Sequence, residues 1–139
     1  MNGTESLIST DLARTVGIVL LTVVAIASGG VFMLRVIQGA LPATSLQKSF
    51  YRAGHAHAGV LVILGTLVLL VVELAGVTGL AARLATGILV AAILMPAGFF
   101  LSVSHRNAEK PNGLIALLWL GVVSLIVGVV AGGVGLLTV

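Results

Sequence analysis

Three histidines, His55, His57 and His105, are the side chains of this chain best suited by type and spacing to chemistry. Imidazole nitrogens are common ligands of zinc, copper and iron, and two of them can hold a haem in a helical bundle. The surrounding sequence is strongly apolar, and polar residues at membrane depth are costly and usually functional. We therefore predict that the histidines bind haem b or a transition metal (Cu, Zn or Fe).

Four further side chains are candidate contacts to such a cofactor: Arg35, Tyr51, Arg52 and Arg106. The arginines are suited to the propionates of a haem, and the same arginines are equally suited to an anionic lipid headgroup. Apart from Glu109, no carboxylate lies near the histidines in the sequence, which argues against a di-iron carboxylate site.

The spacing of the first two histidines limits how they can act together. His55 and His57 are two residues apart, so on a helix they point roughly 200° apart and cannot both face one point. His55 shares its face with smaller and more polar residues, so we expect it to point inward. For His57 and His105, an interfacial position bonded to backbone or headgroups is an equal alternative to ligation.

The composition determines which elements must position these residues. Of the 139 residues, 59% are hydrophobic and 8% are charged, and the mean hydropathy is +1.26. Such a chain needs lipid as its solvent, where only helices satisfy their own backbone within one segment. We predict an all-α integral membrane protein, an up-down antiparallel four-helix bundle forming one domain over 1–139. Its predicted spans are about 12–38, 50–75, 80–104 and 114–137.

The antiparallel arrangement brings the start of the second span and the end of the third to one side of the membrane, so the three imidazoles are expected to converge. Basic residues indicate that this is the cytoplasmic side. Five flank the two loops on that side, against Arg14 and Arg83 on the other. The five are Arg35, Lys48, Arg52, Arg106 and Lys110. We predict a bacterial plasma-membrane protein with both termini extracytoplasmic, and we interpret the sequence pI of about 10.2 as topology, not nucleic-acid binding.

Small residues and aromatic residues indicate how the helices pack and where the membrane interface lies. Ser124, Gly128 and Gly132 form a small-residue stripe on the fourth span. We favour packing of this stripe inside the bundle; the alternative is that it faces another membrane subunit or a second copy. We interpret Phe50, Tyr51 and Trp119 as an interfacial belt, whereas Phe32, Phe99 and Phe100 suit either a belt or a pocket.

The outer part of the sequence offers fewer polar groups. We expect Glu73 to form an ion pair with Arg14 or Arg83, and Asp11 to cap the first helix. Asn2-Gly3-Thr4 matches a glycosylation sequon, a short match to which we give little weight.

Three functions fit these observations. The first is cofactor binding by the histidines for electron transfer or metal handling. The second is a cofactor-free accessory or assembly subunit of a larger membrane complex, for example a respiratory one. The third is a small oligomeric channel or carrier gated by histidine. No hydrolytic or nucleotide-dependent signature is present and the chain has no cysteine, so any enzymatic role is at most that of a redox subunit.

Overall fold

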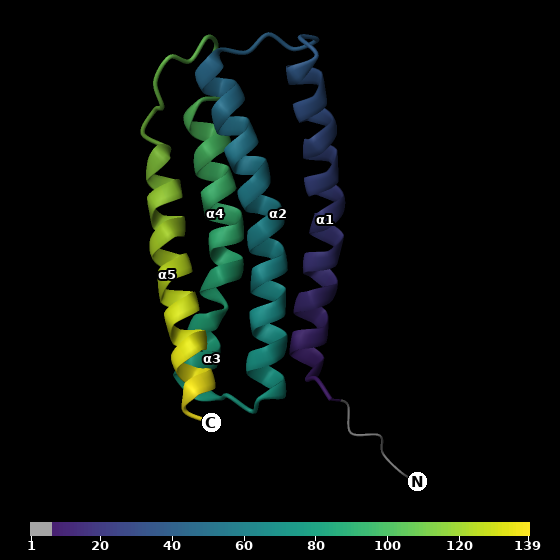
Figure 1. Cartoon of the computed structure of the whole chain (residues 1–139), viewed down its shortest axis with the longest axis vertical. Helices are drawn as coiled ribbons and strands as arrows, with labels where there is room; N and C mark the ends of the chain where they lie inside the picture. The colour runs from purple at the N-terminus through teal and green to yellow at the C-terminus, as the bar shows by residue number, and fades with distance from the viewer. Residues whose placement is uncertain (1–6) are drawn as a thin grey trace.

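The structure, a computed structural model, describes residues 7–139, so the Asn2-Gly3-Thr4 sequon lies outside the described residues. Within them every regular element is a helix (Figure 1). The helices are α1 (Thr10–Ile37), α2 (Ser45–Leu74), α3 (Gly79–Ala85), α4 (Gly87–Ser102) and α5 (Ile115–Leu137).

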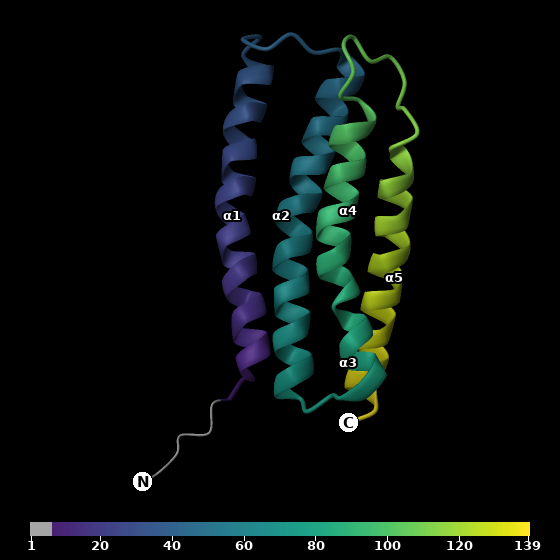
Figure 2. The same cartoon turned by 180° about the vertical axis from the view of Figure 1, so that it is seen from behind.

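Four spans are long and apolar enough to cross a membrane, because α3 and α4 together form the third span. They run up and down in alternation, side by side, as the views from both sides show (Figure 1, Figure 2). The predicted all-α, four-helix transmembrane bundle is therefore confirmed. The α1–α2 and α4–α5 loops lie at one end, which we call the basic end because all five loop-flanking cations belong to it. The start of α1 and the end of α5 lie at the opposite end.

The second span begins at Ser45, five residues before the predicted start. A reciprocal capping box is the reason. The Thr44 hydroxyl accepts a 3.1 Å hydrogen bond from the Gln47 backbone, and the Gln47 side chain accepts a 2.9 Å bond from the Thr44 backbone. The Thr-x-x-Gln pattern is visible in the sequence and would have identified this start.

The third span also differs from the prediction. It is interrupted at Thr86, between α3 and α4, and it ends at Ser102, two residues early. Asn112 explains the early end, because its backbone N–H donates to the Ser102 carbonyl at 2.8 Å and its side chain donates to the Leu101 carbonyl at 3.2 Å. The chain therefore leaves the helix before His105.

Glycines allow α4 and α5 to pack backbone against backbone. A Cβ on Gly98 would lie 2.3 Å from the Leu118 nitrogen, and one on Gly128 would lie 2.8 Å from the Ile88 nitrogen. The Ser124 hydroxyl donates to the Gly87 carbonyl at 2.9 Å. The small-residue stripe is thus used inside the bundle, as favoured from the sequence. Gly128 and Gly132 are buried against other helices of the chain, and association with another subunit through this face stays a prediction.

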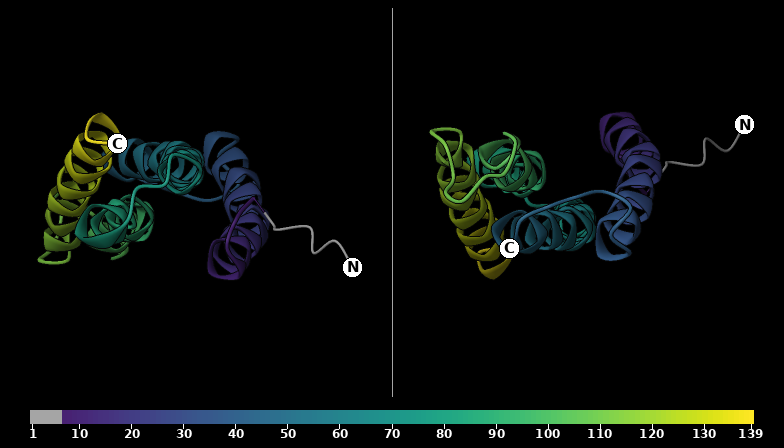
Figure 3. Two further views of the ribbon diagram at one scale, coloured as in Figure 1. Left: turned by 90° about the horizontal axis from the view of Figure 1, so that it is seen from below. Right: turned by 90° about the horizontal axis from the view of Figure 1, so that it is seen from above.

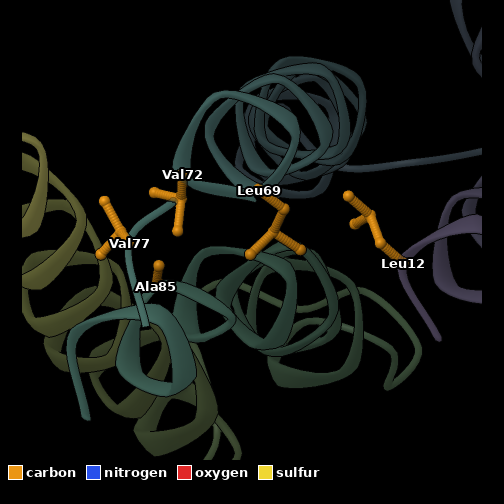
Figure 4. Packing of buried hydrophobic residues seen from close by; sticks show 5 residues of the cluster. All are labelled: Leu12, Leu69, Val72, Val77 and Ala85. Atoms are coloured by element: carbon orange, nitrogen blue, oxygen red, sulfur yellow. The ribbon is translucent and has the colours of Figure 1, made fainter. Parts of the chain in front are cut away.

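The first helix is the least integrated element. Seen along the bundle axis, α1 stands at the edge beside α2, away from α5 (Figure 3), and α2 is the one helix that its backbone closely approaches. At the end opposite the basic end, Leu12 of α1 packs in an apolar core with Leu69 and Val72 of α2, Val77 and Ala85 (Figure 4). Most other α1 side chains are exposed to the surroundings, which for this protein are lipid.

Candidate functional site

His55 lies between α2 and α1, half-buried, about 15 Å along α2 from Ser45. Its imidazole rests against a double glycine of α1. A Cβ on Gly29 would lie 3.3 Å from the His55 Nδ1, and one on Gly30 would lie 3.6 Å from Nε2. The glycine pair therefore makes room for the ring. Within residues 7–139, neither ring nitrogen of His55 has a hydrogen-bond partner.

His57 is also half-buried but faces α4. Its Nδ1 lies 2.7 Å from the Ala53 carbonyl oxygen, and its ring centroid lies 5.1 Å from that of Phe99. Because a carbonyl only accepts, Nδ1 must carry the proton, which leaves the lone pair of a neutral ring on Nε2. His55 and His57 thus point to different neighbours of α2, as their spacing requires.

His105 is exposed in the α4–α5 loop, where its backbone carbonyl, not its imidazole, accepts a 3.1 Å hydrogen bond from Gln47. The expected convergence of three imidazoles is not found, because His55 packs against α1, His57 packs against α4, and His105 is exposed in the loop. Residues 7–139 hold no group of three histidine, cysteine or acidic side chains that could bind a metal ion. Of the candidate contacts, Arg35, Arg52 and Arg106 are exposed at the basic end, and Tyr51 is half-buried.

Aromatic rings near His55 pack on one another across three helices. Phe32 of α1 meets Tyr51 of α2 edge-on, with centroids 5.2 Å apart, and Tyr51 stacks on Phe100 of α4 at 5.5 Å and 18°. We call Phe32, Tyr51 and Phe100 the aromatic triad. Phe50 packs edge-on against Phe99 in the same way. Phe50 and Tyr51 are half-buried and their rings join helices, whereas Trp119, which is 63% exposed, faces outward. The interfacial belt stays a prediction.

A groove of about 450 Å³ lies between α1, α2 and α4. Its walls are apolar and include Ala25, Ile26, Ala58, Val62, Leu89 and Ile93. Ala58 follows His55 by three residues, so the two share one face of α2. Gly29 and Gly30, against which the His55 ring lies, form what we call the glycine notch of α1, and Ile26 precedes Gly29 by three residues. The groove thus ends, toward the basic end, about one helical turn from His55.

At the opposite end, Glu73 ties α2 to the start of α1. Its carboxylate accepts hydrogen bonds from the backbone and the hydroxyl of Ser9, and Ser9 in turn caps α1 through Leu12. The ion pair expected between Glu73 and Arg14 or Arg83 is wrong. Among the described residues the ion pair found is Arg14–Asp11, which is exposed, and the cap of α1 is Ser9, not Asp11.

Gln47 is the polar residue at the basic end that the sequence analysis missed. It is buried, and its side-chain nitrogen donates to the backbone carbonyls of Val103 and His105 at 3.0 and 3.1 Å. Thr44 donates to the Ala108 carbonyl at 2.7 Å. The capping box of α2 therefore also fastens the α4–α5 loop, and its sequence pattern was the available signal.

Comparison with protein-family models, curated proteins and solved structures finds no match for this chain. What the site can do must therefore be argued from its own geometry.

Proposed function

We propose that this chain is a membrane subunit that binds a hydrophobic cofactor for electron transfer, with His55 as the protein group that contacts it. One observation carries the proposal. A half-buried imidazole lies about 15 Å along a membrane-spanning helix, about one helical turn past the end of an apolar groove, with neither nitrogen bonded to the described residues of the protein. Such a group is costly to place there, and a functional ligand offsets that cost.

The local packing supports His55 over the other histidines. Gly29 and Gly30 have no side chains and so leave room for the His55 ring. His57 already uses one nitrogen on the Ala53 carbonyl, and His105 projects from a loop. A site built on one imidazole favours a cofactor that needs few protein ligands, such as a haem or an organic molecule. A bare metal ion needs three or four ligands, which residues 7–139 do not bring together.

The groove gives the channel alternative less support. An ion path needs polar groups along its length, whereas the groove walls are mostly aliphatic, and its threonines turn their hydroxyls to their own helix. Thr15 donates to the Asp11 carbonyl at 2.9 Å and Thr22 to the Val19 carbonyl at 2.6 Å.

The test is to purify the protein gently from its native membrane, record an optical spectrum, and extract and quantify organic and metal cofactors. We expect a stoichiometric cofactor in the wild type that is lost in His55→Ala. His105→Ala is the matched control, because that side chain is exposed, and it should retain the cofactor. A wild-type protein without any cofactor, recovered with stoichiometric larger partners, would overturn the proposal in favour of the accessory-subunit function.

A further inference from the structure

We infer that the cofactor is a quinone with an isoprenoid tail, whose ring binds beside His55 on the aromatic triad and whose tail lies in the groove between α1, α2 and α4. This inference rests on the proposed function and names the ligand class. It follows from the order in which aromatic, polar and aliphatic side chains succeed one another along three helices.

The three helices face the same space with matching stripes. On α2 the stripe is Tyr51, His55, Ala58 and Val62, spaced by three or four residues. On α1 it runs from Phe32 past the double glycine to Ala25 and Thr22, and on α4 from Phe100 to Ile93 and Leu89. In each stripe the aromatic residue lies toward the basic end and the groove-lining residues lie beyond it. The groove itself is therefore aliphatic, and His55 and the aromatic triad lie just past its end, toward the basic end.

The aromatic end suits a flat ring with polar edges. The triad offers stacking and edge contacts, which aromatic groups prefer at centroid distances of about 4.5–7 Å. Within residues 7–139, the Tyr51 hydroxyl and both nitrogens of His55 have no hydrogen-bond partner. A phenol and an imidazole are donors to carbonyl oxygen, and a quinone ring carries two such oxygens.

The aliphatic part suits an unbranched or methyl-branched tail. It runs from Thr15 to Ile26 on α1, a rise of about 16 Å along the helix. Its hydroxyls are bonded to their own helix, as described above, so its wall presents methyl and methylene groups. A tail placed there meets no unpaired donor.

Charge is complementary as well. The basic end has five cationic side chains and one acidic side chain, Glu109, and none of these six is in an ion pair within the described residues. A positive field at this end favours the partly negative carbonyl oxygens of a quinone ring and the anionic forms that reduction produces.

Two other occupants fit less well. A lipid acyl chain fills the groove but makes no use of His55 and Tyr51. A haem macrocycle is much wider than a quinone ring, and because Gly29 and Gly30 lie close to the nitrogens of His55, a haem would need a larger displacement of α1 than a quinone ring does.

The experiment measures binding of three probes to the full chain in nanodiscs of a zwitterionic lipid: a decyl-substituted benzoquinone, the same quinone ring without a tail, and decylbenzene. We expect the tailed quinone to bind tightest. His55→Ala should weaken both quinones about tenfold, the loss of one hydrogen bond at a desolvated site. Ala58→Leu narrows the groove and should weaken the tailed quinone while sparing the ring.

Ala56→Leu is the matched control for the groove, because Ala56 is exposed on the same helix, and it should change nothing. Equal binding of decylbenzene and the tailed quinone would overturn the inference by showing a site for hydrocarbon alone. Extraction of a stoichiometric haem without quinone from the native protein would also overturn it, yet leave the proposed function standing. A native protein that carries no cofactor and binds none of the probes would contradict both the quinone inference and the proposed function.

Discussion

The Ser9 hydroxyl donates a 3.1 Å hydrogen bond to the Glu73 carboxylate, which also accepts from the Ser9 backbone. This contact joins residues 64 positions apart and fixes the beginning of α1 to the end of α2. Near the other end of the same pair of helices, Phe32 meets Tyr51 and His55 fills the glycine notch. The groove therefore lies between two sets of contacts that hold α1 to α2, one at each end of the helix pair.

Glu73→Ala should loosen α1. The substitution leaves the Ser9 donors without an acceptor, and we expect a loss of about 1–3 kcal/mol in the free energy of unfolding. Thermal unfolding in detergent measures it. Glu109→Ala is the control, since Glu109 is exposed at the other end and forms no ion pair among the described residues. Equal midpoints for the two variants would contradict a structural role for Glu73.

Gly128→Ala should destabilise the bundle, whereas Gly133→Ala on the same helix should not. The new methyl at position 128 would lie 2.8 Å from the Ile88 nitrogen, but at position 133 it meets nothing within 4 Å. Overpacking of this kind costs about 1–3 kcal/mol. Both variants remove a glycine from α5, so the difference between their unfolding midpoints isolates the contact. A difference near zero would show that α4 and α5 are farther apart than described.

Gln47→Ala should release the α4–α5 loop. The carbonyls of Val103 and His105 lose their donor, and α2 loses half of its capping box. We expect faster amide hydrogen exchange in residues 103–112 and a loss of about 1–3 kcal/mol. Gln38→Ala provides the comparison, because that side chain is exposed. Unchanged exchange in the loop would mean that Gln47 does not hold it.

The orientation predicted from the basic residues can be tested directly, because the chain has no cysteine of its own. We expect Val139→Cys to react with a membrane-impermeant maleimide in intact cells and Lys110→Cys to react after lysis alone. Both residues are exposed, so access is set by the side of the membrane. The reverse pattern would place the termini in the cytoplasm and the basic loops outside.

The sequence predicted the four spans and the use of the small-residue stripe because both depend on local composition and periodicity. It failed where one residue makes a long-range polar contact. Asn112 ends α4 two residues before the predicted end of the third span. Ser9, not a cation, pairs with Glu73. His55 was expected to point inward, and its ring does pack against another helix. The sequence could not show that Gly29 and Gly30 of α1 would receive the ring, because no local pattern specifies which residues meet across two helices.

The peripheral position of α1 also bears on how the chain matures in the bilayer. Helices α2 to α5 hold one another without it, whereas α1 depends on α2. Although α1 is synthesised first, it must wait for α2 before it can dock. In the finished protein α1 is held by α2 almost alone, so its contacts with that one neighbour determine whether this first span stays attached to the other three.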